Sequence, residues 1–138
     1  MTIIYSARAA AKGGRGGHTE TDDKKVVLDL SPPGSNGPGT NPEQLFACGY
    51  GACFGGALAF IAGQKKITLP ETPTVHVDIN LHKTETGFHL SGAINVALSG
   101  LDDAVAAELV RATHDFCPYS KATRGNIDMA ISLNGKPV

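Results

Sequence analysis

Residues 41–66 read NPEQLFACGYGACFGGALAFIAGQKK, and this stretch decides the fold. Asn41 can cap a helix, Pro42 suits its first position, and Glu43 favours the positive end of the helix dipole. Gln44 follows Asn41 by three residues, as in a capping box. The residues that follow are apolar on nearly every side, which predicts one long helix that is buried all round.

Four glycines interrupt this apolar run, at positions 49, 51, 55 and 56. Each of them weakens a helix by about 1 kcal/mol relative to alanine. Because small residues let two backbones approach closely, we expect these positions to lie against another helix or a sheet.

Segments typical of strands lie on both sides of the long helix. Residues 2–7 and 24–30 precede it, with a glycine-rich turn between them and a loop rich in proline and glycine after them. Residues 75–82 alternate apolar and polar side chains, and together with residues 87–98 they predict a hairpin. Residues 126–133 are expected to close the chain as a strand.

A second helix is expected between the hairpin and the last strand. It begins near Ser99, and Pro118 ends it before a short helical turn over residues 119–124. Its expected apolar face consists of Val105, Leu109, Ala112 and Phe116. The order of strands, helix, hairpin, helix and strand predicts an α+β fold with a mainly antiparallel sheet, in one domain over residues 1–138.

Charge and composition exclude several classes of protein. The 138 residues include 12 Lys plus Arg and 13 Asp plus Glu, which argues against a strongly basic nucleic-acid-binding protein. No signal peptide and no membrane-spanning segment is predicted, so we expect a cytoplasmic protein that binds neither nucleic acid nor membrane. The five histidines form no pattern of metal ligands, and no metal site is expected.

The three cysteines are too few for a disulfide scaffold, but two of them can form a redox pair. Cys53 lies inside the long helix and Cys117 ends the second one. Packed helices have axes about 8–10 Å apart, so facing cysteines can approach the separation that a disulfide needs. Both can equally be buried packing residues with inert thiols, and the residues alone leave open which of them would attack. Cys48 points about 140° away from Cys53 around the helix and is interpreted as packing.

Arg15 is the candidate cation for stabilising a thiolate, because glycines on both sides let its backbone approach a neighbouring surface. Glu43 is its candidate anchor. The alternatives are a solvated loop arginine and a carboxylate that only serves the helix end. Glu43 and Cys53 are ten residues apart, about 15 Å along a continuous helix. If both serve one site, the helix breaks near residues 49–51 or Glu43 comes from a second chain.

Two long motifs carry a specific resemblance: residues 39–47 (GTNPEQLFA) continuing as residues 49–54 (GYGACF), and residues 117–126 (CPYSKATRGN). Both resemble the organic hydroperoxide resistance branch of the Ohr/OsmC family, and the resemblance covers essentially the whole chain. It implies an OsmC-like fold with long central helices, in an intertwined homodimer with both sites at the interface. Cys48 departs from the family pattern, which has alanine there.

The resemblance also implies a function, a thiol peroxidase that reduces organic and fatty-acid hydroperoxides to alcohols. Cys53 would be the attacking thiolate and Cys117 the resolving thiol, with Arg15 and Glu43 as the activating pair. No cofactor is expected to be bound, and lipoyl groups on partner proteins would act as the external dithiol reductant. The apolar side chains expected to line the substrate pocket are Leu45, Phe46 and Phe54.

Two other classes of function use the same residues differently. A sensor or ligand-binding module would switch through the cysteine pair without turnover, and a structural stress protein would only pack its cysteines. Acyl transfer by a cysteine nucleophile is disfavoured because no general base is expected near Cys53.

Overall fold

The computed structural model describes all residues from 1 to 138 and divides them into two compact units, Met1–Leu45 and Phe46–Val138. Each unit contains its own sheet. The single domain expected over the whole chain stays a prediction.

The first unit is a small antiparallel sheet of three strands in the order β1-β2-β3. The strands are β1 (Ala9–Lys12), β2 (His18–Thr21) and β3 (Val27–Asp29). The strand expected over residues 2–7 is wrong, because no strand of this chain pairs with that segment. A single 3-10 turn, η1 (Gly14–Gly16), joins β1 to β2, and a side chain at Gly17 would lie 2.0 Å from the Lys12 carbonyl oxygen.

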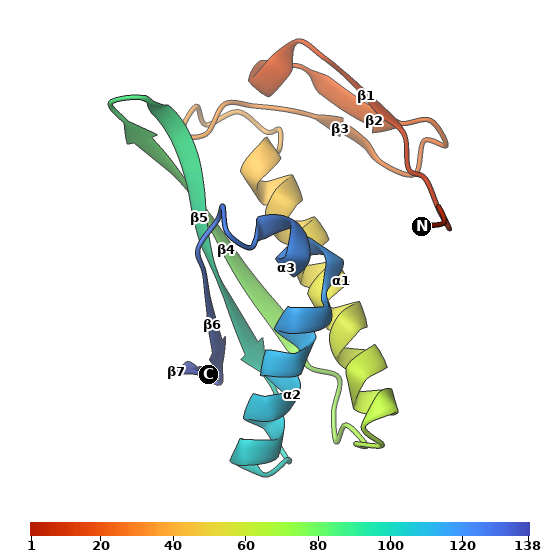
Figure 1. Cartoon of the computed structure of the whole chain (residues 1–138). Coiled ribbons are helices and arrows are strands. Elements are labelled where there is room, and N and C mark those ends of the chain that lie inside the picture. Colours follow the sequence, from red (N-terminus) through yellow and green to blue (C-terminus); the bar gives the residue numbers. More distant parts are fainter. The chain divides into compact units, whose positions relative to one another are not determined.

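The second unit packs helices on one face of a four-stranded sheet in the order β4-β5-β6-β7 (Figure 1). Its strands are β4 (Thr74–Thr84), β5 (Gly87–Ala97), β6 (Met129–Leu133) and β7 (Lys136–Pro137). Its helices are α1 (Pro42–Gln64), α2 (Asp103–Phe116) and α3 (Pro118–Thr123). The first residues of α1 belong to the first unit. The hairpin of β4 and β5 is antiparallel, as predicted. Strand β6 pairs parallel to β5, because α2 and α3 form the crossover between them. The α+β class is confirmed.

Helix α1 begins where its sequence predicts. The side chain of Asn41 accepts a 2.9 Å hydrogen bond from the backbone N–H of Gln44, which satisfies one free amide of the first turn. The second half of the capping box is absent, since the Gln44 side chain instead accepts a bond from the Thr40 hydroxyl. Glu43 is therefore held in the first turn of a well-capped helix.

The expectation that α1 is buried all round is wrong for the single chain. Its buried residues lie on one face and join the core: Tyr50, Phe54, Ala57, Leu58, Ile61 and Ala62. The opposite face is apolar but exposed, and includes Cys48, Ala52, Gly56, Ala59 and Phe60. By length and composition alone α1 is also apolar enough to cross a membrane, a segment that the sequence analysis did not recognise. Packing of one face in the core accounts for only part of this apolar character.

Close approach explains two of the glycines of α1. A Cβ at Gly49 would lie 3.2 Å from the Tyr119 hydroxyl, and one at Gly51 would lie 3.4 Å from a methyl of Val77 in β4. The predicted contact with a helix or sheet is confirmed at these positions. At Gly56 a Cβ would meet nothing within 4 Å.

The buried face of α2 differs from the predicted one. Its buried residues are Ala106, Leu109, Val110 and Thr113. Val105 and Phe116, expected in the core, are exposed, whereas the polar Thr113 is buried. Thr113 tolerates burial because its hydroxyl donates a 2.7 Å hydrogen bond to the Leu109 carbonyl within the helix.

Candidate active site

Cys53 and Cys117 lie in contact within the second unit, with their sulfur atoms 3.6 Å apart. Cys53 is positioned by the middle of α1, and Cys117 by the junction at which α2 ends and α3 begins. Both thiols are free; Cys117 is fully buried and Cys53 is partly exposed. A disulfide requires about 2.05 Å between the sulfurs, so the two atoms need to close by only about 1.5 Å to form one.

The surroundings of Cys53 in this unit do not favour its thiolate. Burial is the largest influence and raises the pKa of the Cys53 thiol, and the nearby Cys117 thiol raises it further. The backbone N–H of Tyr119, in the first turn of α3, lowers the pKa but does not reverse the shift. Because the thiolate is the nucleophile, Cys53 requires a cation that the second unit does not supply.

Arg15 and Glu43 form a two-pronged ion pair within the first unit. The Arg15 guanidinium donates hydrogen bonds of 2.7 and 2.6 Å to the two carboxylate oxygens of Glu43. This contact raises the pKa of Arg15 and lowers that of Glu43. Arg15 occupies the 3-10 turn η1, where Gly13 and Gly14 adopt φ values of 87° and 61° that favour glycine. One edge of a fixed guanidinium thus remains available, and the Arg15 side chain is 46% exposed.

The three predicted pocket residues occupy different environments. Phe46 is partly buried, stacks on Tyr119 at 6.2 Å and meets Tyr50 edge-on at 5.9 Å. Phe54 is wholly buried in the core and has no exposed surface. Leu45 is half-buried at the end of the first unit. Phe54 therefore packs in the core of this unit, and a lining role for the three residues stays a prediction.

Sequence reasoning missed a buried hydrogen-bond network beside the two cysteines. The Tyr50 hydroxyl donates a 2.9 Å bond to Oγ of Ser120, which is also 2.9 Å from Nδ1 of His114. Oγ1 of Thr123 lies 3.1 Å from the Tyr50 hydroxyl. Tyr50 precedes Cys53 by three residues and Ser120 follows Cys117 by three, but this spacing alone does not indicate that their hydroxyls meet.

Exposed aromatic rings lie next to the cysteine pair in the sequence. Phe60 follows Cys53 by two turns of α1, and Phe116 precedes Cys117. Their rings stack at 4.9 Å, and the Lys121 ammonium lies 5.6 Å from the Phe116 ring. The two phenylalanines are 49% and 39% exposed, so apolar surface remains open there.

Cys48 lies apart from this pair. It is exposed on α1, so its interpretation as a packing residue is wrong for the single chain. It lines a shallow hollow together with Ala47, Gly51, Ala52, Val75, His76 and Val77. The chain contains no group of three or more His, Cys, Asp or Glu side chains that could hold a metal ion.

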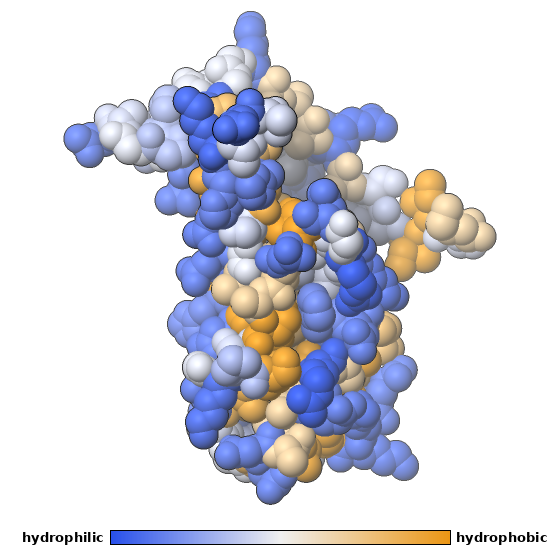
Figure 2. Space-filling model, turned by 60° about the vertical axis from the view of Figure 1, so that its left-hand side comes forward, coloured by the Kyte–Doolittle hydropathy of each residue, from blue (hydrophilic) through white to orange (hydrophobic).

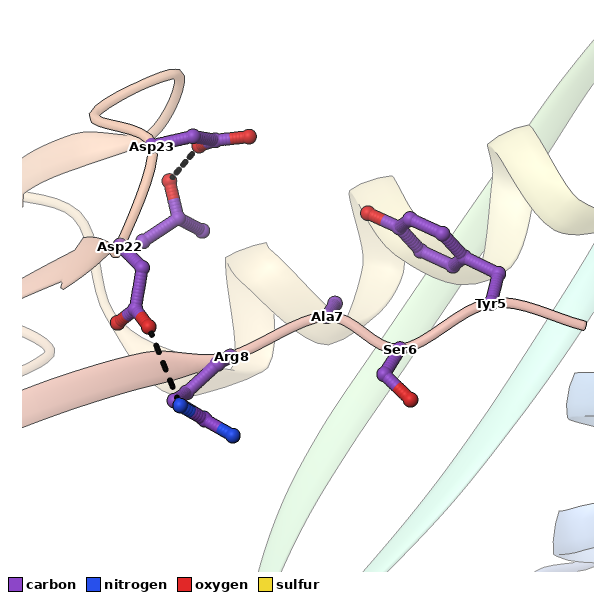
Figure 3. Close-up of a pocket in the computed structure, with 7 residues that line it drawn as sticks. Tyr5, Ser6, Ala7, Arg8, Asp22 and Asp23 are labelled. Carbon is purple, nitrogen blue, oxygen red and sulfur yellow. Dashed lines mark hydrogen bonds and ion pairs between the residues drawn. The ribbon is translucent and has the colours of Figure 1, made fainter. Parts of the chain in front are cut away.

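A further hollow lies in the first unit. Figure 3 shows its lining, which includes Tyr5 and the exposed pair of Arg8 with Asp22, whose nearest charged atoms are 3.8 Å apart. Neither a cysteine nor any predicted site residue lines it. The four residues predicted to be catalytic form two side-chain pairs, Cys53 with Cys117 and Arg15 with Glu43, and their catalytic roles stay predictions.

Comparison with known proteins supports a family assignment. The family described as OsmC-like protein matches residues 34–132. The organic hydroperoxide resistance protein of Xanthomonas axonopodis pv. citri is 42% identical over 135 residues, which cover 95% of each chain. The organic hydroperoxide resistance protein OhrB of Bacillus subtilis is 42% identical over 133 residues, covering 94% of this chain and 98% of its own.

Solved structures agree with this assignment. A crystal structure of an organic hydroperoxide resistance protein from Legionella pneumophila matches with a TM-score of 0.91 at 43% identity, over 96% of this chain and 98% of that chain. The crystal structure of OhrB from Bacillus subtilis matches with a TM-score of 0.88 at 43% identity, over 95% and 99% of the two chains. The fold of this chain is the fold of these proteins.

Proposed function

This chain belongs to the OsmC-like protein family, as its motifs predict, and we propose that it is a thiol peroxidase that reduces organic hydroperoxides, including those of fatty acids, to alcohols. The Cys53 thiolate attacks the terminal peroxide oxygen, the O–O bond breaks, and the alcohol leaves with a proton. Cys53 becomes a sulfenic acid. The Cys117 thiol then attacks the Cys53 sulfur, which forms the disulfide and releases water.

The observation that carries this proposal is the 3.6 Å contact between the sulfurs of Cys53 and Cys117. Cys53 is the more exposed of the two, which supports its role as the thiol that meets the peroxide, and the burial of Cys117 supports its role as the resolving thiol. The relatives with 42% identity are named for resistance to organic hydroperoxides, which supports this substrate class.

Activation of Cys53 requires a cation, and Arg15, held by Glu43, is the candidate. Ten residues of continuous helix separate Glu43 from Cys53, which is a rise of about 15 Å. Helix α1 runs unbroken through residues 49–51, so we propose that the Arg15–Glu43 pair of one chain acts on Cys53 of a second copy. The exposed apolar face of α1 gives such a homodimer a surface to bury.

Other apolar side chains also favour association. Figure 2 shows apolar surface exposed among polar side chains. Among the exposed residues are Ile3, Ile4, Leu81 and Phe88. Soluble monomers rarely leave much contiguous apolar surface uncovered, so a second copy of the chain that covers these side chains accounts for their exposure in the single chain.

The disulfide must be reduced before a second turnover. We propose that a dithiol does this, namely a lipoyl group carried by a partner protein, and that no bound cofactor takes part. One thiolate of the dithiol attacks Cys53, the more exposed sulfur, and its second thiol releases Cys53 by closing a cyclic disulfide.

The first test counts thiols. Reduced protein is mixed with one equivalent of cumene hydroperoxide, free thiols are counted within seconds, and the disulfide is mapped, with Cys53→Ser and hydrogen peroxide as controls. We expect loss of two thiols as a Cys53–Cys117 bond, faster with the organic peroxide. Persisting thiols, or equal loss in Cys53→Ser, would overturn the assignment. Repeated turnover with dihydrolipoamide, but not with glutathione, separates an enzyme from a redox sensor.

The second test asks whether the site is shared between chains. Arg15→Ala and Cys53→Ser chains are each expected to be inactive, and they are unfolded together and refolded as a mixture. If Arg15 serves the partner's Cys53, random pairing restores about a quarter of the parent activity. If Arg15 serves Cys53 of its own chain, the mixture stays inactive, because no chain then carries both residues.

A further inference from the structure

Two parallel connections join α1 to α3 inside the second unit. One is the contact between the Cys53 and Cys117 sulfurs, and the other is the 2.9 Å hydrogen bond from Tyr50 to Ser120. Tyr50 stands three residues before Cys53, and Ser120 stands three residues after Cys117. Residues three apart are neighbours on a helix surface, so each connection lies beside the other on both elements.

Helix α3 meets the core through polar side chains and through one half-exposed ring, Tyr119, which contacts Phe46 and Tyr50. It is six residues long, and its only buried residues are Ser120 and Thr123. Both of their hydroxyls approach the Tyr50 hydroxyl, at 2.9 and 3.1 Å. A helix of six residues is unstable by itself, so these bonds act together with the Tyr119 ring contacts to hold α3 in place, with Cys117 directly before it.

The network continues to the last turn of α2. The Ser120 Oγ, which accepts from the Tyr50 hydroxyl, also lies 2.9 Å from Nδ1 of His114, so its own hydrogen can point to that nitrogen when Nδ1 carries no proton. Burial lowers the pKa of His114, which keeps the ring neutral and able to accept that bond. No buried side-chain nitrogen or oxygen is left without a partner. The network therefore joins α1, α3 and α2 around Cys117.

We propose that the Tyr50–Ser120–His114 network is a positioning device that holds Cys117 against Cys53, and that it governs how fast oxidised Cys53 is resolved rather than how fast it is oxidised. The inference rests on the proposed peroxidase chemistry. In the step concerned, the Cys117 sulfur bonds to the Cys53 sulfur and the S–O bond of the sulfenic acid breaks. The hydroxyl then leaves with the thiol proton as water.

Loss of the network has a specific chemical consequence. A sulfenic acid that waits for Cys117 remains open to a second peroxide, which oxidises it to a sulfinic acid that thiols do not reduce. Attack on the first peroxide needs Cys53 and its activating cation. Helix α3 influences this step only through the backbone N–H of Tyr119, whose effect on the Cys53 pKa is smaller than that of burial, so a shift of α3 should slow attack far less than resolution. Variants of the network should therefore separate the two steps.

The test uses full-length protein carrying Cys48→Ser, so that only two thiols remain. Tyr50→Phe and Ser120→Ala each remove one hydroxyl of the network, and the double variant removes both. Thr113→Val is the matched control, because it removes an equally buried hydroxyl that bonds only within α2. Samples mixed with cumene hydroperoxide are quenched over time with dimedone and N-ethylmaleimide and read by mass spectrometry.

We expect peroxide consumption in the first turnover to stay near the parent rate in all variants. Disulfide formation should slow roughly tenfold in Tyr50→Phe and in Ser120→Ala, with a dimedone adduct and more sulfinic acid on Cys53. The double variant should slow it little further, since the two hydroxyls act as one unit. If Ser120→Ala fails to fold, Tyr50→Phe, which keeps its buried ring, carries the test.

Disulfide formation at the parent rate in Tyr50→Phe would overturn the positioning role, as would equal slowing in Thr113→Val. Slower peroxide consumption together with slower disulfide formation would also overturn it, because the network would then act on Cys53 itself. Failure of the parent protein to consume peroxide is a different outcome, which removes the proposed function and leaves no step for the network to govern.

Discussion

Arg15 and Glu43, 28 positions apart in the sequence, are joined by two short hydrogen bonds between guanidinium and carboxylate. This geometry fixes the plane of the guanidinium and leaves its other edge free. Glu43 is itself fixed by the cap of α1, so the cation is oriented by a rigid element although it lies in a short turn. An oriented cation would favour the thiolate of a partly buried cysteine such as Cys53, whose pKa is raised.

Glu43→Gln should slow oxidation of Cys53 without abolishing it. The amide of glutamine keeps the shape of the side chain and can accept one hydrogen bond from Arg15. It lacks the negative charge that holds the Arg15 guanidinium by two hydrogen bonds. We expect roughly a tenfold slower reaction with cumene hydroperoxide, measured in a single turnover, against complete loss in Cys53→Ser. An equal loss in both variants would mean that Glu43 does more than orient Arg15.

The Glu43 carboxyl should titrate at low pH because of Arg15. The hydrogen bonds from Arg15 lower the pKa of Glu43 in the folded chain. As the pH falls, the unfolded chain therefore takes up this proton before the folded chain does. The contribution of the Arg15–Glu43 ion pair to the free energy of unfolding is complete above the ordinary glutamate pKa and is lost as the pH falls through the pKa of folded Glu43. Carbon-13 NMR of the carboxyls should show the Glu43 pKa rising toward its ordinary value in Arg15→Ala.

Glu71 is the internal control for that titration. Its pKa is also lowered, but by the backbone N–H and hydroxyl of Ser99, so Arg15→Ala should leave it unmoved. A Glu43 titration that is the same in the parent and in Arg15→Ala would show that the ion pair does not persist in solution.

Local signals in the sequence were enough for α1 and for the hairpin. The cap at Asn41 and the apolar run after it act over a few residues, and the alternation of β4 needs no knowledge of its partner. Signals failed where distant contacts decide. Thr113 is polar in the sequence, yet the packing of α2 buries it, and its hydroxyl bonds within the helix. Residues 2–7 alternate like a strand, but no strand of this chain pairs with them.

The candidate site divides in the same way. Arg15, Glu43, Cys53 and Cys117 stand out by residue type and by resemblance to a family. The hydrogen bond between Tyr50 and Ser120 spans 70 positions and has no counterpart in composition or periodicity. Both residues read as ordinary packing and capping positions, and only the fold brings their hydroxyls together.

Gly56→Ala tests the apolar face of α1. In the single chain a Cβ at Gly56 meets nothing within 4 Å, so alanine alone should stabilise the helix by about 1 kcal/mol. If a second copy packs on this face, the added methyl pushes the two helices apart. We then expect a weaker dimer, which falls into monomers already at protein concentrations at which the parent is still dimeric. Sedimentation velocity and thermal unfolding at several concentrations measure this.

Gly63→Ala is the comparison for that experiment. A Cβ there also meets nothing within 4 Å, and the position lies one residue before the end of α1, where a change disturbs helix packing least. We expect higher thermal stability without a change in association. A rise in melting temperature at every concentration for Gly56→Ala as well would mean that this face of α1 stays open.

Cys48→Ser should leave the chemistry intact. Cys48 is exposed and points away from Cys53 on α1, so its thiol has no route to the pair. We expect the same loss of two thiols with one equivalent of peroxide, at a rate within about twofold of the parent, as for other surface substitutions. With excess peroxide the parent should lose a third thiol slowly and Cys48→Ser should not. A slower Cys53–Cys117 bond in Cys48→Ser, or a mapped bond to Cys48 in the parent, would place Cys48 in the reaction and change the assignment of the resolving thiol.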